Sequence, residues 1–229
     1  MTGMYTTANH IDLYLKPTQD TYDAFQRAYE HYNINLFDGR LPNCMITMPR
    51  RGRTLGYFSR QRFIKDGTSY CDEIALNPTY FSLRTDEETL STLVHEMVHL
   101  WQFHFGKSGR GRYHNRQWAE AMKRIGLFPS DTGKEGGKEI GDRMSHYIMD
   151  DGAFIKSTLQ LLAQGFKIEW SDDLSKLSAK TVPKTPKSPP ESKTGKRVKY
   201  NCPQCGLNAW AKHEAKLICG DHKVSMKPA

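Results

Sequence analysis

Residues 90–104 read LSTLVHEMVHLWQFH, and this stretch decides the fold. Its large apolar side chains recur at steps of three and four residues, which predicts an amphipathic helix with one apolar face. They are Leu90, Leu93, Val94, Met97, Leu100 and Trp101. Thr85 or Asp86 can cap the start of this helix, because either side chain accepts hydrogen bonds from free backbone N–H groups.

The same stretch contains the pattern H-E-x-x-H, formed by His95, Glu96 and His99. Residues four apart on a helix project from one side about one turn apart, so two imidazoles can share one zinc ion. The glutamate beside them is then in reach of the attacking water and can act as its base. The alternative is a pair of surface histidines on an ordinary helix; the helical context favours zinc.

A catalytic zinc ion usually has three protein ligands and one open position, so a further ligand is needed. His104 is expected on the same helix, pointing away from the pair. His114 follows the glycine-rich turn of residues 106–111 and opens a second helical run at residues 115–126, where a ligand would be firmly held. We take His114 as the third ligand and His146 as the reserve.

With these motifs in place, the sequence resembles the SprT-like (Spartan-related) family of zinc metalloproteases. The resembling stretches are NLFDGRL at 35–41, LGYF at 55–58, EIALN at 73–77, HEMVHLWQ at 95–102 and HNRQW at 114–118. The resemblance implies His95, His99 and His114 as ligands of a catalytic zinc ion, with Glu96 as the base. One departure is Asn115, where the family commonly has glycine.

Around this helix the sequence predicts an α+β fold. Residues 18–36 carry an aromatic and aliphatic stripe at helical spacing, and short runs at 44–48, 54–59 and 70–76 are typical of strands. The resemblance implies a zincin-like metalloprotease core, a small sheet packed on the H-E-x-x-H helix. It also implies that the strand just before that helix lies at the sheet edge, where an extended peptide can bind as an added strand.

Beyond the second helical run we expect a glycine-rich loop over 131–142, a short helix over 154–164 and a last strand over 166–170. The chain of 229 residues then suits three parts: a metallopeptidase domain over 1–170, a basic linker rich in proline and lysine over 171–199, and a small zinc ribbon over 200–229.

The ribbon is predicted from two short ligand pairs, C-P-Q-C-G at 202–206 and C-G-D-H at 219–222. Together they offer four ligands for a structural zinc ion: Cys202, Cys205, Cys219 and His222. His213 is an alternative fourth ligand. About thirty residues cannot form a stable core alone, so zinc must hold this segment together. Trp210 either stacks on single-stranded nucleic acid or is the core residue of the ribbon.

Charge and cysteine content narrow the class of protein. Residues 1–170 contain 21 Lys and Arg against 20 Asp and Glu, whereas residues 171–229 contain 12 against 5. This basic tail favours a polyanionic partner. No apolar run approaches the ~20 residues of a membrane span, and residues 1–16 do not resemble a signal peptide. Five cysteines, three of them clustered, suit a reducing compartment. We expect a cytoplasmic protein without a membrane partner, nucleoid-associated if bacterial.

These observations predict a zinc-dependent metalloendopeptidase with one catalytic and one structural Zn²⁺. The resemblance points to protein substrates held on DNA, and the basic tail and ribbon are expected to dock on DNA, possibly single-stranded. The alternative is a nucleic-acid-binding or adaptor protein whose zinc site is structural or barely active. A purely structural site has no need of a base, so Glu96 argues against that alternative.

Overall fold

The computed structural model describes residues 16–50, 52, 54–176, 198–212 and 215–228. The chain divides into two compact units, Met1–Pro186 and Lys187–Ala229. Residues 1–15, which include almost all of the stretch that does not resemble a signal peptide, lie outside the described residues, as do His213 and most of the expected linker. Among the helices that are described, none is long and apolar enough to cross a membrane.

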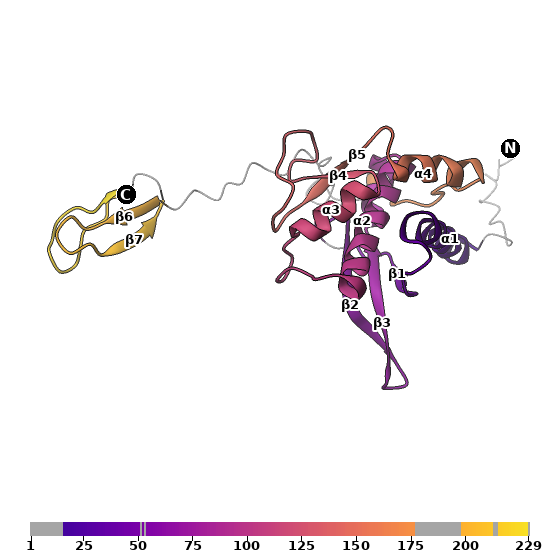
Figure 1. Cartoon of the computed structure of the whole chain (residues 1–229), viewed down its shortest axis with the longest axis horizontal. Helices are drawn as coiled ribbons and strands as arrows, with labels where there is room; N and C mark the ends of the chain where they lie inside the picture. The colour runs from indigo at the N-terminus through magenta and orange to yellow at the C-terminus, as the bar shows by residue number, and fades with distance from the viewer. Residues whose placement is uncertain (1–15, 51, 53, 177–197, 213–214, 229) are drawn as a thin grey trace, which may run out of the picture. The chain divides into compact units, whose positions relative to one another are not determined.

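The first unit is organised around helix α2 (Asp86–Phe105), which carries the H-E-x-x-H pattern (Figure 1). Thr85 and Glu88 form a capping box: the Thr85 hydroxyl accepts from the Glu88 N–H at 3.2 Å, and the Glu88 carboxylate accepts from the Thr85 N–H at 3.0 Å. The acidic first turn also suits the positive end of the helix dipole. The expected helix and its cap are therefore confirmed.

A three-stranded sheet packs beside α2. Its strands are β1 (Met45–Thr47), β2 (Gly56–Lys65) and β3 (Ser69–Leu76), in the order β1-β3-β2. β3 pairs in parallel with β1 and antiparallel with β2. β3, the strand before α2, is thus central, and the expectation that it forms the sheet edge is wrong. Its last five residues are all buried, as in a strand with neighbours on both sides.

β2 is longer than the sequence indicated, because it continues through a bulge between Ser59 and Phe63. The buried carboxylate of Asp72 holds this bulge: one oxygen accepts from the Gln61 N–H at 2.6 Å, and the other lies 2.7 Å from His104 Nε2. His104 lies on α2, as expected, and it contacts Asp72 of β3 instead of joining the other histidines.

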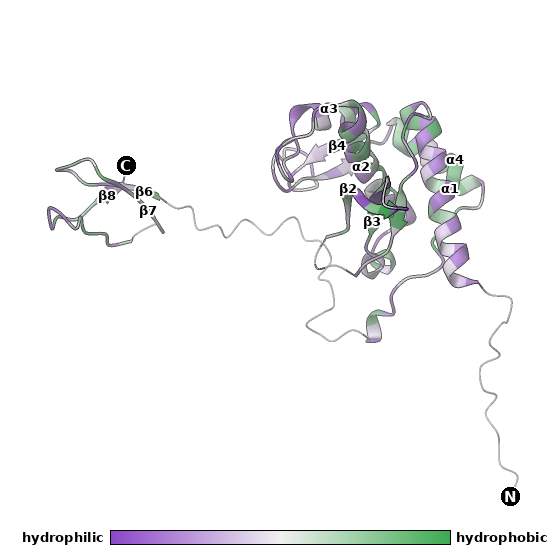
Figure 2. Ribbon diagram, turned by 90° about the horizontal axis from the view of Figure 1, so that it is seen from below, coloured by the Kyte–Doolittle hydropathy of each residue, from purple (hydrophilic) through white to green (hydrophobic). Residues whose placement is uncertain are grey.

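Helices α1 (Pro17–Phe37) and α4 (Ala153–Ala163) pack on one another and on α2. Three aromatic residues of the α1 stripe, Phe25, Tyr29 and Tyr32, are in the core, whereas Tyr22 at its start is exposed. Tyr32 stacks on Phe154, and its hydroxyl lies 2.8 Å from Thr158 Oγ1. Figure 2 colours much of α2 and β3 green, consistent with a shared apolar core at the centre of this unit.

Helix α3 (Arg116–Arg124) is followed by a hairpin that the sequence did not reveal, β4 (Leu127–Ser130) paired with β5 (Ser145–Ile148). The expected glycine-rich loop connects these two strands. The strand expected over 166–170 is absent from the described structure. There the Phe166 ring packs on Phe25, and the Ile168 N–H donates to the Asp86 carboxylate instead of a strand partner.

The described part of the first unit also contains two short 3₁₀ helices, η1 (Pro78–Leu83) and η2 (Leu174–Lys176). Asp172, which was expected in the linker, accepts hydrogen bonds from Arg50 at 2.6 Å and from Thr79 at 2.9 Å and so belongs to the first unit.

The second unit is a small sheet of β6 (Val198–Asn201), β7 (Asn208–Ala211) and β8 (Lys227–Pro228), in the order β7-β6-β8.

Candidate metal centres

The histidine cluster starts from two side chains that α2 holds rigidly. His95 is buried and His99 is partly buried on a helix whose neighbouring side chains Leu93, Val94 and Met97 are fully buried. Because the core fixes the position and rotation of α2, both imidazoles are presented from one side of it before any ligand binds.

His114 reaches the cluster from the residue before the N-cap of α3. Its backbone pairs with Gly141, the His114 N–H donating to the Gly141 carbonyl at 2.8 Å. Its Nδ1 lies 3.1 Å from the same carbonyl oxygen, which leaves Nε2 for the cluster. Asn115 caps α3, since its side-chain oxygen accepts from the Trp118 N–H at 3.1 Å. Its φ of −87° needs no glycine, so the departure from the family pattern is accommodated.

The structure brings His95, His99 and His114 together, with one ligand atom of each within 4.8 Å of the others. The Nε2 atoms of His99 and His114 are 3.1 Å apart. Burial lowers the pKa of all three, to about 3 for His99 and well below the usual value for His95. The imidazoles are therefore neutral, the form that binds metal, and this donor set fits zinc.

Trp118 of α3 forms the apolar floor of the cluster. Its side chain is fully buried, and its ring centroid lies 4.4 Å from that of His114, 5.0 Å from His95 and 5.5 Å from His99. Large aromatic neighbours restrict the rotamers of the imidazoles. Sequence reasoning placed Trp118 on the apolar side of the second helical run, but its contact with all three histidines was not predicted.

The side chain of Glu96 extends from α2 toward strand β2. The carboxylate is buried and accepts a hydrogen bond from the backbone N–H of Phe58. Burial raises its pKa to about 8, and the hydrogen bond from Phe58 opposes that rise. β2 approaches α2 so closely here that a Cβ on Gly56 would lie 2.9 Å from Thr92 Cγ2 and 3.4 Å from Glu96 Oε1.

His146, the reserve ligand, lies behind His95 on β5. Its Nδ1 is 3.1 Å from His95 Nδ1, and its Nε2 is 2.8 Å from Ser91 Oγ. Burial, together with the charge of Arg84, lowers the pKa of His146 to about 3. The residue is part of the surroundings of the cluster rather than one of the three converging groups. No local signal in the sequence indicated this position, because it depends on the β4–β5 pairing.

A second cluster lies in the small unit. The side chains of Cys202, Cys205, Cys219 and His222 offer ligand atoms within 4.8 Å of one another, which fits a zinc site of three thiolates and one imidazole. Each ligand pair surrounds a tight turn; the Gly206 N–H and the Lys223 N–H donate to the carbonyls of the first and third cysteines. Hydrogen bonds from His222 lower the pKa of Cys219 to about 6, which favours its thiolate.

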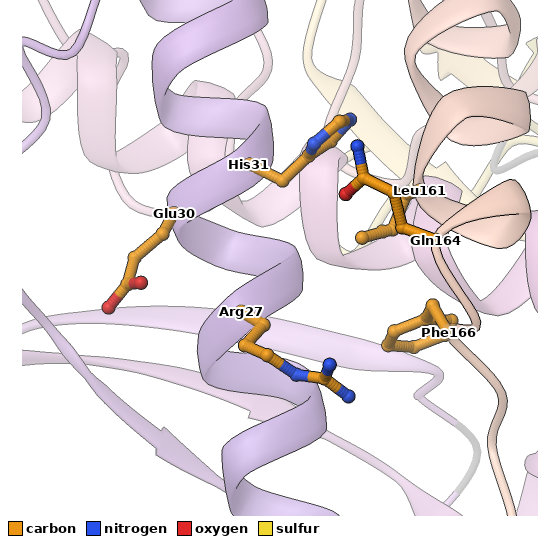
Figure 3. Close-up of a pocket in the computed structure, with 6 residues that line it drawn as sticks. All are labelled: Arg27, Glu30, His31, Leu161, Gln164 and Phe166. Atoms are coloured by element: carbon orange, nitrogen blue, oxygen red, sulfur yellow. The ribbon is translucent and has the colours of Figure 1, made fainter.

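The first unit also has a hollow that contains none of these residues (Figure 3). His31 of α1 and Leu161 of α4 face each other across it, and Glu30 points outward. His31 is held there by Ser157, whose carbonyl oxygen is 2.8 Å from His31 Nε2. This histidine is a structural contact between two helices.

Comparison with known proteins finds a family whose model covers the first cluster. The model of the SprT-like family matches residues 25–134, a range that includes all three converging histidines and Glu96 but neither His146 nor the cysteine cluster. The chain is also similar to an "uncharacterized protein in mucB 3′ region" of Salmonella typhimurium. The two are 49% identical over 59 residues, which cover 25% of this chain and 80% of the relative. No solved structure matches the chain.

Proposed function

Because the chain belongs to the SprT-like family, we propose that its first unit is a zinc-dependent metalloendopeptidase. The observation that carries the proposal is the convergence of three neutral imidazoles beside a buried carboxylate, all within the matched range. A site that only stabilises the fold would close the metal with a fourth protein ligand and would have no use for Glu96.

In this proposal His95, His99 and His114 hold the ion, and Glu96 moves the proton. A bound zinc ion supplies Lewis acidity, which polarises a carbonyl and lowers the pKa of water toward ~7. The positive charge of a bound ion would favour the ionised form of Glu96 against the effect of burial, so that Glu96 could accept the proton of the attacking water and pass it to the leaving amine. The Phe58 N–H holds the carboxylate in place during both transfers.

Strand β2 is the edge at which we expect the peptide substrate to bind. β2 pairs with β3 on one side, and on its other side the Phe58 N–H is directed at Glu96 rather than into the sheet. An extended peptide that adds to this edge would lie beside the histidine cluster. Its main chain would supply most of the contacts, so cleavage would depend weakly on substrate side chains.

The decisive experiment compares Glu96→Gln with His99→Ala on an unfolded protein substrate, with zinc content measured in parallel. Glu96→Gln should retain zinc at the histidines and lose about 10²- to 10⁴-fold in turnover, because the general base is gone. His99→Ala should lose both zinc and turnover. Glu120→Gln, an exposed glutamate on α3, is the matched control and should behave as wild type. Full turnover by zinc-loaded Glu96→Gln would refute the mechanism.

We propose further that the second unit docks on nucleic acid and so directs the peptidase to DNA-associated proteins. Trp210 is 60% exposed, so it is not the core of the ribbon; the core consists of Tyr200, Cys202, Cys219 and Met226. Trp210 lies directly opposite Lys199 in the β6–β7 pair, which puts both side chains on one face. An exposed aromatic ring beside a cation suits stacking on a base and contact with a phosphate.

Binding of the full chain to a single-stranded oligonucleotide tests this part. Trp210→Ala should weaken binding by about 1–3 kcal/mol, about 5- to 150-fold, and affinity should fall steeply with salt. Ile218→Ala removes another exposed apolar side chain of the unit and should have little effect. Unchanged affinity in Trp210→Ala, or binding that salt does not alter, would remove the docking proposal and leave the peptidase proposal intact.

A further inference from the structure

His146 and Ser91 extend the histidine cluster by a chain of hydrogen bonds. His146 lies on β5 with its ring centroid 5.2 Å from that of His95. Its two ring nitrogens face different partners, Nδ1 toward His95 Nδ1 at 3.1 Å and Nε2 toward Ser91 Oγ at 2.8 Å. Ser91 and His95 are four apart on α2, so both contacts of His146 are to one side of that helix.

The hydrogen bond that Ser91 donates determines which ring nitrogens of His146 and His95 carry protons. A serine hydroxyl has one proton, and Ser91 donates it to the carbonyl oxygen of Glu88 at 2.7 Å. Toward His146 the hydroxyl can therefore only accept, so His146 Nε2 carries a proton. A neutral imidazole has one N–H, which makes His146 Nδ1 an acceptor. His95 Nδ1 must then be the donor, and the lone pair of His95 lies on Nε2.

We propose that His146 is a positioning residue that selects the His95 tautomer able to bind metal. A metal-binding histidine usually donates its other N–H to a carboxylate, a backbone carbonyl or water, which fixes both tautomer and ring orientation. His146 supplies that acceptor for His95, as the Gly141 carbonyl does for His114. The inference rests on the proposed function only in taking His95 as a ligand of the zinc ion.

The same hydrogen bonds exclude His146 as a ligand. Its Nδ1 lone pair accepts from His95 and its Nε2–H donates to Ser91, so no lone pair is left for a metal ion. A direct ligand would have to break the contact with His95. A ligand nitrogen shifts strongly when zinc binds, whereas the nitrogens of a positioning residue do not, and this difference between the two roles is measurable.

Side-chain ¹H–¹⁵N spectra of the full wild-type chain, recorded without and with zinc, test the proton assignment and the exclusion of His146 as a ligand, and they need neither a variant nor an activity measurement. His146 should be protonated at Nε2 and not at Nδ1, and His95 should be protonated at Nδ1. A proton on His146 Nδ1, or a metal-induced shift of a His146 nitrogen as large as that of His99, would overturn the proposal.

Zinc affinity tests the positioning role, with binding followed through the His99 and His114 resonances so that the cysteine cluster does not contribute. His146→Phe keeps a ring but removes the acceptor, and should weaken zinc binding by about 10- to 100-fold. His146→Asn retains a short acceptor and should recover most of that loss, whereas a purely structural role would not favour Asn over Phe. Tyr147→Phe, on the same strand, should bind zinc as wild type. Wild-type affinity in a folded His146→Phe would contradict the role, whether or not the chain cleaves peptides.

Discussion

The two candidate metal centres differ in what surrounds them. Among the described residues, the unit of the histidine cluster has 25 buried apolar residues in its core, and Trp118 packs under the histidine rings. In the described part of the unit that contains the cysteine cluster, the core has four buried residues, two of which are proposed ligands themselves. The comparison teaches that similar ligand geometry can serve opposite purposes: in the first unit the fold holds the metal site, and in the second the metal site holds the fold.

Removal of zinc should separate the two units most clearly. A structural zinc site contributes about 10–16 kcal/mol in small zinc-binding peptides, far more than a four-residue core supplies. Cys205→Ser, or a strong chelator on wild type, should therefore collapse the amide chemical-shift dispersion of residues 198–228 while the first unit keeps its native spectrum. Cys71→Ser, outside the cluster, is the matched control. A ribbon that stays folded without metal would break the comparison.

The converse change removes the floor of the histidine cluster. Trp118→Ala should destabilise the first unit by about 3–5 kcal/mol through the lost contacts and the cavity, and leave the ribbon unaffected. Denaturant unfolding monitored by amide signals from each unit measures this. Trp170→Ala, at a side chain that is 43% exposed, should cost much less. Equal losses in the two variants would mean that the core does not support the site as described.

Gly56 tests the contact between the edge strand and Glu96. Gly56→Ala places a methyl group 2.8 Å from the Ala75 carbonyl oxygen and 2.9 Å from Thr92 Cγ2, so β2 must move away from α2. We expect a loss of about 1–3 kcal/mol in stability, as for other overpacking changes, together with lower turnover. Gly220→Ala, where a Cβ meets nothing within 4 Å, is the control. Unchanged stability and turnover in Gly56→Ala would show that the close approach is not needed.

The same contrast explains what the sequence could and could not predict. The periodicity of α2, the spacing of His95 and His99, and the C-x2-C and C-x2-H pairs are local, so residues a few positions apart define them. The central place of β3 depends on a parallel strand almost thirty residues earlier. The position of His146 depends on two four-residue strands, one containing a proline, whose pairing leaves no short-range pattern.

The smallest expected effect concerns the start of α2, ten residues before His95. Thr85→Ala removes the hydroxyl that accepts from the Glu88 N–H and should cost about 1 kcal/mol, lowering the melting temperature of the first unit by about 2–4 °C. Zinc affinity at the histidines should not change, because the core rather than the cap orients the middle of the helix. Thr85→Ser keeps the hydroxyl and should restore stability. If calorimetry and zinc titration instead showed that stability and zinc affinity fall together, the cap would also hold the histidines in place. The core would then support the metal site less rigidly than the packing around Trp118 implies.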